Sequence, residues 1–580
     1  MSKDEMTNTE KPSPLKRLFR LLKPDQQEII NIYIYSIFNG LVYLSVPLGI
    51  QAIVNLIIGG EITTSWILLI IFVVLGVAAT GILRLFQFRI TENLQQKIFT
   101  RAAFEFSYRL PRVRMESLYK HYVPELMNRF FDVMTVQKGL PKLLIDFSVA
   151  VLQVLFGLIL LSLYHPLFIV FSVLLVFLLY VIFHFTVKKG LTTSLEESKY
   201  KYKVAHWLEE VGRNNISFKL AGDTALPLER TNSHVSSYLK SRESHFKLLM
   251  QQYSYMVVFK VIVAASLLIL GGILVMNQTI NIGQFVAAEI IILLVMESVE
   301  KLIVSLETIY DVITGLEKIG EVTDLELERT EGINLKDEMN TPGMKVKTEG
   351  LSFKYPGSER NILESISLAV KRKEKFLITG KNNSGKSTLL KLIAGLYDVK
   401  KGVVSYNGIS LNNLNINDMR SVIGECFAQG TLFEGTVLEN ITMGRKDIPF
   451  ENVKWAVNHL KLKSFIRNLP KGYDTFVEPQ GYKSSRSIIT KILIARSIVS
   501  KPNLLLIEDI LDNLDRQERF KIMDFLTSEE QDWTLIAVSS EAHFAKRCDR
   551  IAIFSKGRIT KTGTYEELKL SEEFKNEEDA

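Results

Sequence analysis

A phosphate-binding loop is predicted at residues 380–388, which read GKNNSGKST between an apolar strand at 375–379 and a helical run at 389–397. Its glycines let backbone N–H groups converge on phosphate, and the N-terminus of the following helix adds a positive dipole end. Lys386 can reach the β- and γ-phosphates of a nucleotide, and the Ser387 hydroxyl can hold Mg²⁺. The sequence therefore predicts a nucleotide site formed by Gly380, Lys381, Asn382, Asn383, Ser384, Gly385, Lys386, Ser387 and Thr388.

The elements that must position this loop belong to an α/β region expected at residues 344–570, and the preceding part of the chain differs from it in composition. Hydrophobic residues make up 47% of the 580 residues and charged residues 23%, yet apolar runs crowd residues 29–305. The net charge of +7 comes largely from Lys and Arg in the loops between these runs. That distribution indicates membrane topology and not nucleic-acid binding.

Six apolar segments are long enough to cross a bilayer core, which requires about 20 helical residues. A single run of this kind would be compatible with a buried core helix, but six of them favour a membrane domain. A kinase or a soluble P-loop enzyme is disfavoured, because six spans would have no role in it. The spans are expected near residues 29–54, 65–88, 143–164, 166–187, 255–276 and 281–305.

The charges of the connecting loops predict the orientation of these spans. Three short connections contain no Lys or Arg, namely 57–64, the hinge around His165 and 277–283. Two long connections, 89–142 and 188–254, are rich in both. Basic loops stay in the cytoplasm. We therefore expect a multi-pass plasma (inner) membrane protein whose termini, long loops and residues 306–580 are cytoplasmic.

The composition of the chain suggests five parts. The long loops carry helical apolar spacing, so the membrane helices are expected to continue into the cytosol as stalks of about 50 Å or less. The tips of these stalks, at 119–125 and 214–220, would be free to touch another domain. The parts are a cytoplasmic N-terminal segment with an amphipathic helix at 1–28, a transmembrane domain at 29–320, a linker at 321–343, a nucleotide-binding domain at 344–570 and an acidic tail at 571–580.

Two charged residues inside the predicted spans are candidates for a functional role. An ionisable side chain within a membrane is by default a functional candidate, because its burial is costly. Glu289, in the sixth span, is expected to face a polar translocation path. Lys260 lies near the cytoplasmic end of the fifth span, where its ammonium either has a role in the path or extends to the interface.

The order of motifs in the second half resembles the ABC exporter family, in which six membrane helices precede one nucleotide-binding domain. The resemblance implies that the nucleotide is ATP and that Tyr355 stacks on adenine. It also implies a multidomain membrane protein, with an all-α six-helix transmembrane domain and an α/β P-loop NTPase domain. It rests on the loop at 380–388 and on 351–356 (LSFKYP), 432–441, 465–475, 501–507, 556–558 and 563–568. Within the family, residues 283–289 (GQFVAAE) look most like exporters used in type I secretion of proteins and peptides.

The hydrolytic motifs of the family are altered in this chain. Ala428 stands where the family has a glutamine, and Glu508-Asp509 replaces the usual Asp-Glu at the end of the Walker B strand. Ser540 stands at the position of the switch histidine. The signature, usually Leu-Ser-Gly-Gly-Gln, reads SSRSI at 484–488 and contains Ser485, Arg486 and Ser487.

Each of these changes has a physical consequence at the catalytic positions Glu508, Asp509 and Ser540. Glu508 is one methylene longer than aspartate, so its carboxylate would crowd the Mg²⁺ that it is expected to hold. Asp509 is one methylene shorter than the glutamate that orients the attacking water, and a displacement of about 1 Å can cost about 100-fold in rate. Ser540 lacks the reach of an imidazole. We therefore expect a site that binds ATP and hydrolyses it slowly or not at all.

The favoured interpretation is a half-transporter subunit that exports its cargo by ATP-dependent dimerisation of nucleotide-binding domains. Its expected partners are membrane lipid and a second half-transporter. A different chain with intact motifs is favoured as this half-transporter over a second copy of the same chain. If the system is a type I secretion system, a membrane-fusion adaptor is a further expected partner. No nucleic-acid partner is expected. The alternatives are a slowly hydrolysing homodimeric exporter and, from another class, a non-transporting membrane regulator that responds to ATP.

Overall fold

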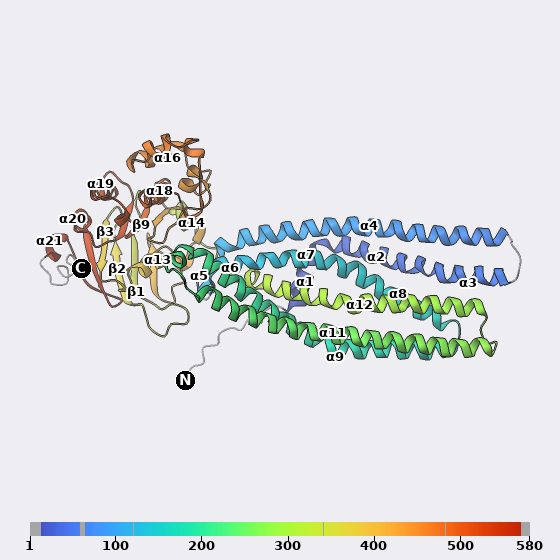
Figure 1. Ribbon diagram of the computed structural model, residues 1–580. Coiled ribbons are helices and arrows are strands. Elements are labelled where there is room, and N and C mark those ends of the chain that lie inside the picture. The colour runs from blue at the N-terminus through green and yellow to red at the C-terminus, as the bar shows by residue number, and fades with distance from the viewer. Residues whose placement is uncertain (1–12, 59–63, 120, 340, 482, 570–580) are drawn as a thin grey trace. The chain divides into compact units, whose positions relative to one another are not determined.

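The computed structural model describes residues 13–58, 64–119, 121–339, 341–481 and 483–569. The chain divides into two compact units. The first comprises Met1–Pro111 and His121–Leu325, and the second comprises Arg112–Lys120 and Glu326–Ala580. Figure 1 shows long helices in the first unit and sheets with shorter helices in the second. The expected acidic tail at 571–580 lies outside the described residues.

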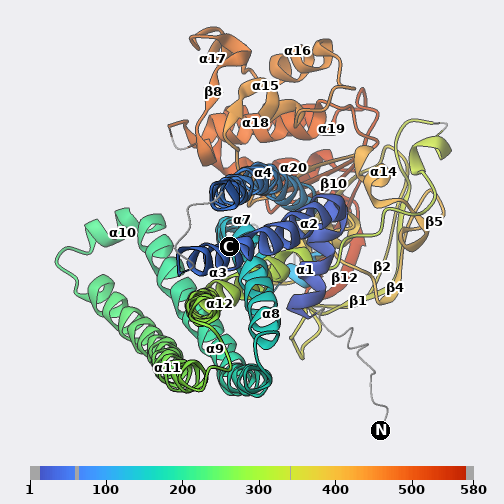
Figure 2. The same cartoon turned by 90° about the vertical axis from the view of Figure 1, so that its right-hand side faces the viewer.

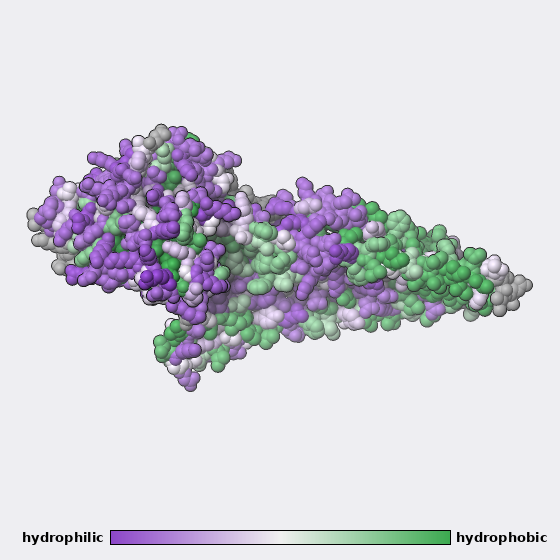
Figure 3. Space-filling model, turned by 90° about the horizontal axis from the view of Figure 1, so that it is seen from above, coloured by the Kyte–Doolittle hydropathy of each residue, from purple (hydrophilic) through white to green (hydrophobic). Residues whose placement is uncertain are grey.

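Six helical stretches of the first unit are long and apolar enough to cross a membrane, which confirms the six predicted spans. They are Lys16–Ile58, Thr64–Arg112, Val123–Ser162, Pro166–Arg213, Leu226–Met276 and Ile282–Thr323. Figure 3 shows apolar side chains over one end of these helices and hydrophilic ones over the other. The helices and helical turns along this part of the chain are α1 (Pro14–Leu22), η1 (Lys23–Asp25), α2 (Gln26–Tyr43), α3 (Ser45–Ile58), α4 (Thr64–Arg109), η2 (Leu110–Arg112), α5 (Met115–Leu118), α6 (Val123–Met127), η3 (Asn128–Phe131), α7 (Asp132–Lys142), η4 (Leu143–Phe147), α8 (Ser148–Ser162), α9 (Pro166–Arg213), α10 (Asn215–Leu220), α11 (Leu226–Met276) and α12 (Ile282–Thr323).

Two of the long helices begin at residues that cap them. α9 starts at Pro166, and the His165 ring accepts a hydrogen bond from the Leu167 N–H at 3.2 Å. α12 starts after Asn281, whose side chain accepts from the Gln284 N–H at 2.7 Å while the Gln284 side chain accepts from the Asn281 N–H at 2.8 Å. This reciprocal capping box satisfies two donors that a helix start leaves unpaired. The caps keep the turns before α9 and α12 short, so α8 and α9, like α11 and α12, run antiparallel.

α12 lies in the interior of the helical unit, whereas α4 lies at its surface. Half of the most apolar window of α12 is buried, against none of the corresponding window of α4. Tyr310 of α12 is fully buried, and its hydroxyl accepts a hydrogen bond from the Gln252 amide at 2.8 Å. α9 approaches it so closely that a Cβ at Gly190 would lie 2.2 Å from the Tyr310 ring. The sixth span is therefore enclosed by its neighbours, and the second presents its apolar side chains outward, as a lipid-facing helix does.

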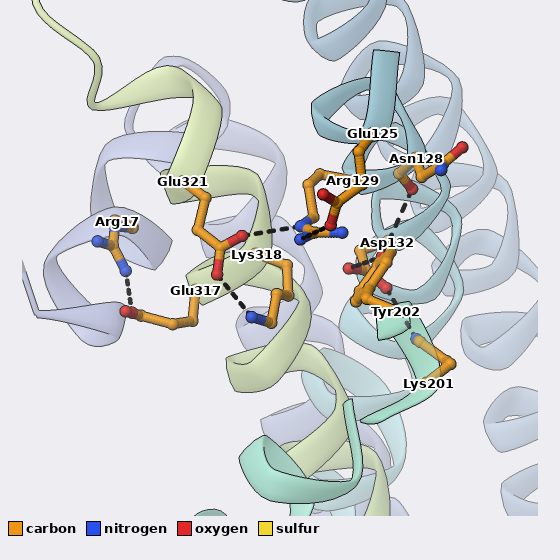
Figure 4. Close-up of polar contacts among 10 residues, drawn as sticks. All are labelled: Arg17, Glu125, Asn128, Arg129, Asp132, Lys201, Tyr202, Glu317, Lys318 and Glu321. Atoms are coloured by element: carbon orange, nitrogen blue, oxygen red, sulfur yellow. Dashed lines mark hydrogen bonds and ion pairs between the residues drawn. The ribbon is translucent and has the colours of Figure 1, made fainter. Parts of the chain in front are cut away.

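A network of polar side chains, here called the stalk network, ties α1, α6, η3, α7, α9 and α12 of the first unit together (Figure 4). The Arg129 guanidinium donates to Glu321 at 2.8 Å and lies 3.7 Å from the centroid of the Tyr202 ring. The Tyr202 hydroxyl donates to Asp132, and Arg17 of α1 pairs with Glu317. Glu321 is 39 residues from the start of α12, about 58 Å at 1.5 Å per residue. The network therefore lies well beyond the apolar length of the helices. Its members are Arg17, Glu125, Asn128, Arg129, Asp132, Lys201, Tyr202, Glu317, Lys318 and Glu321.

The second unit is built on a six-stranded sheet in the order β12-β11-β3-β10-β9-β6 and a four-stranded antiparallel sheet in the order β2-β1-β4-β5. The larger sheet is parallel apart from its edge strand β12. In β3, Phe376 and Ile378 face one apolar core and Leu377 faces the other, as expected of a sheet covered on both faces. The strands are β1 (Val346–Phe353), β2 (Leu363–Val370), β3 (Lys375–Gly380), β4 (Lys401–Tyr406), β5 (Ile409–Ser410), β6 (Ile423–Cys426), β7 (Gly435–Thr436), β8 (Phe476–Val477), β9 (Leu504–Glu508), β10 (Thr534–Val538), β11 (Arg550–Ser555) and β12 (Arg558–Gly563).

Shorter helices connect the strands of this unit and cover its sheets. They are α13 (Lys386–Ile393), α14 (Ile416–Ser421), α15 (Val437–Thr442), α16 (Phe450–His459), α17 (Lys463–Arg467), α18 (Arg486–Ile498), α19 (Arg516–Thr527), α20 (Ala542–Arg547) and α21 (Tyr565–Leu568), with the turns η5 (Leu335–Glu338), η6 (Leu411–Asn413), η7 (Gly472–Asp474), η8 (Pro479–Gly481) and η9 (Leu511–Asn513). Figure 2 shows α18 and α19 beside each other in this unit.

The second unit also contains residues 112–119, which lie far from the rest of it in the sequence. Val113 forms an isolated antiparallel bridge with Leu327, and the Arg114 N–H donates to the Glu326 carbonyl at 2.9 Å. The Glu116 carboxylate accepts from the Asp398 N–H at 2.6 Å. A segment of the first long loop is therefore held by hydrogen bonds within the sheet-containing unit.

Candidate nucleotide-binding site

The predicted phosphate loop lies between β3 and α13 and requires its glycines for their backbone. Gly380 has φ +143°, and a Cβ there would lie 2.2 Å from the Phe554 carbonyl oxygen of the neighbouring strand β11. Gly385 has φ +103°, and a Cβ there would lie 3.0 Å from the Ile362 carbonyl oxygen. Gly385 is also the N-cap of α13 and supplies no side chain to its first N–H groups. These N–H groups and the helix dipole can therefore bind an anion.

Lys386 and its neighbours carry the polar groups of this loop. Lys386 is 9% exposed, and its ammonium donates to the carbonyl oxygens of Gly380 and, at 3.0 Å, of Lys381. It thus folds back over the loop, where phosphate oxygens could replace the two carbonyls as partners. The buried Ser384 Oγ has no hydrogen-bond partner in the part of the chain that the structure describes. An orphaned buried hydroxyl is costly unless a ligand or water satisfies it.

Tyr355 lies at the side of the loop within a cluster of aromatic rings. Its hydroxyl is 3.0 Å from the Thr388 Oγ1 at the start of α13. Phe353 and Tyr397 contact it edge-on, with ring centroids 5.1 and 5.4 Å away. Tyr119 is stacked on it at 5.3 Å with an interplanar angle of 12°. One face of the ring expected to receive adenine is therefore covered by a side chain from the first long loop.

Tyr119 is a site residue that the sequence did not reveal. It opens the predicted loop tip at 119–125, but nothing in its local sequence associates it with Tyr355, which is 236 residues away. The hydrogen bonds that anchor residues 112–116 bring it there. The one feature of the sequence that could have indicated this contact is that Tyr119 is an aromatic residue in a loop expected to touch another domain.

Glu508, the last residue of β9, and Asp509, which follows it, lie at the same edge of the sheet as the phosphate loop, because β3 and β9 flank β10 in parallel. Glu508 is 8% exposed, and its carboxylate accepts from the Ala428 N–H at 3.4 Å. Asp509 has φ +28°, which is unusual for a residue with a Cβ, and its N–H donates to the Val538 carbonyl at 3.0 Å. The backbone after this strand is therefore held in a strained conformation.

Burial raises the pKa of Asp509 to about 6, although the Lys386 ammonium opposes this effect. The neighbouring carboxylates of Asp512 and Glu508 add to the increase by repelling its negative charge. The interaction with Lys386 places Asp509 in the field of the phosphate loop. As the pH falls through about 6, the Asp509 carboxylate becomes protonated and this attraction is lost.

The remaining predicted positions lie on other elements. Ser485 caps α18, its Oγ accepting from the Ile488 N–H at 3.4 Å, and Arg486 begins that helix with an exposed side chain. Ser487 is half-buried and Ser540 is exposed. Within the described ranges, none of these four forms a hydrogen bond or ion pair with residues 380–388. The nearby His543 is held by Asp524 at 2.9 Å and stacks on Phe520, so it belongs to the packing of α19 and α20.

The charged residues of the predicted spans have different surroundings. The Lys260 ammonium pairs with Glu300 of α12, so it is neutralised inside the helical unit. Glu289 of α12 is half-buried and forms no ion pair or hydrogen bond with any side chain among the residues that the structure covers. Lys260 and Glu289 therefore do not pair with each other.

Both halves of the chain match models of known protein families. The model described as the ABC transporter transmembrane region matches residues 29–299, and the model described as ABC transporter matches residues 363–511. Among solved structures, that of a bacterial Atm1-family ABC exporter with ATP bound resembles this chain with a TM-score of 0.79. It is 18% identical in sequence, and the likeness covers 94% of this chain and 96% of that one. At this identity the likeness establishes the fold.

Curated relatives match over part of their length. The putative multidrug export ATP-binding/permease protein YgaD of Bacillus subtilis is 29% identical over 299 residues, 51% of each chain. The uncharacterized ABC transporter ATP-binding protein YwjA of the same organism is 24% identical over 60% of each chain. A putative multidrug export protein of Staphylococcus aureus is 32% identical over 39% of each chain. The chain therefore spans between about two fifths and three fifths of the length of these relatives.

Proposed function

Because the chain belongs to the ABC transporter family, with six membrane helices and one nucleotide-binding domain in a single polypeptide, we propose that it is a half-transporter that drives export through ATP-dependent pairing of nucleotide-binding domains. The observation that carries the proposal is the intact phosphate loop, with Lys386 over its backbone and the glycines that its geometry requires. Export over import is supported by the fold shared with an exporter structure.

The residues around the loop fit ATP together with Mg²⁺. The Ser387 hydroxyl and the buried Glu508 carboxylate are oxygen donors, which Mg²⁺ prefers. Lys386 and the N-terminus of α13 provide positive charge for the phosphates, and the orphaned Ser384 hydroxyl gains a partner. The bound nucleotide supplies the free energy that holds two nucleotide-binding domains together. This chain's residues hold the phosphates and the metal, and Tyr355 orients the base.

The partner is proposed to be a different half-transporter with intact catalytic residues. Three observations support this: Asp509 is short, strained at φ +28° and has a raised pKa; Ser540 has replaced a histidine; and Ala428 offers only its backbone N–H to Glu508. A second copy of the chain would repeat every one of these defects in both ATP sites. A competent partner supplies the groups that this chain lacks.

Purification of the tagged chain from its native membrane tests the assembly and the activity together. A second, different half-transporter should co-purify in equal amount, and vesicles containing the pair should accumulate substrate only with Mg·ATP. Recovery of a homodimer that transports slowly would favour the homodimeric alternative. A complex that binds ATP and changes conformation without any flux would support the regulator instead and contradict the proposal.

The proposed orientation predicts which engineered thiols react from outside the cell. Asn277 and Ser217 are both exposed, the first between α11 and α12 and the second in α10, so they form a matched pair. Asn277→Cys should react with an impermeant thiol reagent in intact cells, and Ser217→Cys should react only after permeabilisation. The natural Cys426 and Cys548 are buried and give little background. External labelling of the Ser217 variant would overturn the orientation. Glu61 and Lys120 belong to the corresponding predicted external and cytoplasmic connections, but they lie outside the described residues.

The stack of Tyr119 on Tyr355 predicts a competition with adenine. A stacked aromatic pair contributes about 0.5–1.5 kcal/mol, which corresponds to about twofold to tenfold in affinity. If the base must displace Tyr119, then Tyr119→Ala should tighten ATP binding by that factor, while Tyr119→Phe, which keeps the ring, should leave it unchanged. Titration with a fluorescent ATP analogue measures the change. Weaker binding in the alanine variant would mean that the two rings hold the base together.

A further inference from the structure

A cavity of about 360 Å³ lies among the membrane helices, between α2, α4, η4, α8 and α12. Part of its wall is apolar, including Val77 and Val149, as expected within a bilayer. Four charged side chains also line it, and charges within a membrane are costly unless they lie near its polar boundary. They are Arg84 of α4, Asp146 of η4 and Glu297 and Lys301 of α12.

The four charges are two cations and two anions in two partly exposed pairs, one of them close and the other wide. The Arg84 guanidinium lies 3.8 Å from the Asp146 carboxylate, and their side chains are 57% and 39% exposed. Lys301 pairs with Glu297 one turn away on α12 at 2.7 Å, with 46% and 57% of these side chains exposed. Partly exposed ion pairs contribute little to stability. Each of the four side chains therefore retains exposed surface with which it can bind a charged ligand.

A break in helix geometry presents Asp146 to this cavity. Residues 143–147 form a π-helical turn, η4, directly after Pro141 in α7. A π turn adds one residue to an α-helical path and so rotates the following side chains by about 100°. Such turns occur frequently at functional sites.

Gln87 contributes an acceptor that has no partner. This side chain lines the cavity and is fully buried. Its amide nitrogen donates to the Ser36 hydroxyl at 2.9 Å and to the Ile32 carbonyl at 3.3 Å. Its Oε1 has no hydrogen-bond partner among the described residues. A buried, unsatisfied acceptor is unfavourable. Because the Gln87 side chain is fully buried, this acceptor lies behind the surface of the cavity wall, and a donor in the cavity reaches it only if the wall shifts.

The cavity lies at the level of one membrane leaflet. Arg84 is 20 residues from the start of α4, Asp146 is 16 residues from the end of α8 and Glu297 is 15 residues from the start of α12. At 1.5 Å per residue these positions are about 30, 24 and 22 Å from the helix ends that the short connections join. The hydrocarbon core is about 30 Å thick. The charges thus lie near the polar boundary opposite the short connections.

We propose that this cavity binds the head group of a zwitterionic membrane lipid, a phosphate together with an ammonium, and that such an amphiphile is the cargo. Arg84 and Lys301 bind the phosphate, while Asp146 and Glu297 bind the ammonium. The acyl chains lie along the exposed apolar face of α4 beside the cavity, where Val74 is 60% and Leu75 62% exposed. The assignment as cargo rests on the proposed export function, whereas the binding site itself does not.

Photolabelling of the full-length protein in lipid nanodiscs without nucleotide tests the site. The probes are phosphatidylethanolamine, phosphatidylglycerol and diacylglycerol with the same diazirine-bearing acyl chain. Phosphatidylethanolamine should label α4, α8 and α12, and about tenfold less in Arg84→Gln with Lys301→Gln or in Asp146→Asn with Glu297→Gln. Phosphatidylglycerol should bind more weakly only in the first of these variants, because it has no ammonium. Labelling that is independent of the head group, or unchanged in both variants, would overturn the proposal.

Two further variants guard against misfolding and general charge effects. Glu243 and Lys247 form an exposed ion pair one turn apart on α11, so Glu243→Gln with Lys247→Gln removes two charges, one of each sign, away from the cavity and should leave labelling unchanged. Arg84→Asp with Asp146→Arg keeps both charges in the cavity and should retain labelling; its loss would count against the site. Displacement of the lipid by a soluble zwitterionic dipeptide at equal concentration would assign the cavity to peptides instead.

The same lipid distinguishes failure of the site from failure of export. In vesicles that contain the complete complex, the labelled phosphatidylethanolamine should cross the bilayer only with Mg·ATP. Head-group-specific binding without such movement would leave the binding site standing and contradict the export function. ATP-driven movement that the cavity variants do not slow would leave export standing and overturn the site.

Discussion

Replacement of Lys386 by alanine is expected to lower the affinity for Mg·ATP by about 100-fold. ATP should bind the natural protein at micromolar to millimolar concentrations, about −8 to −4 kcal/mol. Lys386 is 9% exposed and its ammonium already sits over the phosphate loop, so its charge meets the phosphates in a site that excludes much of the water. Loss of a charge-assisted bond in such a place costs about 3 kcal/mol.

The matched control is Lys381→Ala. Lys381 belongs to the same loop, but its side chain is exposed and the structure uses only its carbonyl oxygen. Its removal should change the affinity by less than about threefold, as for an exposed charge. Labelling by a photoreactive ATP analogue and calorimetric titration both measure the effect. Equal affinity in the Lys386 variant and the natural protein would refute the nucleotide site.

A complex with a competent partner is expected to hydrolyse ATP at only one of its two sites. In this family two nucleotide-binding domains meet head to tail, so each ATP lies between the Walker residues of one chain and the signature of the other. One site combines this chain's Lys386, Glu508, Asp509 and Ser540 with the partner's signature. The other combines the partner's Walker residues with residues 484–488 of this chain, where Ser485 keeps a hydroxyl.

Removal of the partner's Walker B glutamate should therefore lower turnover by about 100-fold or more, because the other site cannot take over. Asp509 is one methylene short and Ser540 provides no imidazole. The decisive variant restores this chain in the same background: Glu508→Asp, Asp509→Glu and Ser540→His together should recover turnover, since the partner's signature facing them is intact. Ala542→Ser, at the half-buried start of α20, serves as a control that leaves turnover low.

Steady-state release of phosphate by the purified complex measures both effects. Undiminished hydrolysis after removal of the partner's glutamate would contradict the assignment of turnover to one site. Arg486 of the competent site has three alternatives: it clashes with the nucleotide, its guanidinium contacts the γ-phosphate, or it remains in solvent. Arg486→Gly separates them, because turnover rises if the clash is relieved, falls if the contact is lost and stays constant if the side chain is in solvent.

The features that the sequence determined are those that depend on a short stretch of chain. Six spans follow from runs of apolar residues, because a bilayer requires length and hydrophobicity of each helix separately. The phosphate loop follows from glycines whose backbone conformations no other residue adopts easily, such as Gly380 at φ +143°. The departures at Ala428, Glu508, Asp509 and Ser540 are visible by counting from fixed motifs, and their catalytic meaning stays a prediction.

The tertiary structure decided which distant groups meet, since a contact between residues far apart leaves no periodic signal in either one. Hydrogen bonds along residues 112–116 carry Tyr119 onto Tyr355. The packing of α11 against α12 pairs Lys260 with Glu300. The sequence alone had left two interpretations of Lys260, a role in the translocation path or extension to the membrane interface. The π turn at 143–147 and the convergence of four helices gather Arg84, Asp146, Glu297 and Lys301 around one cavity. The pairing of Glu297 with Lys301 can be read from their spacing of four residues on one helix, whereas their proximity to Arg84 and Asp146 is determined only by the fold.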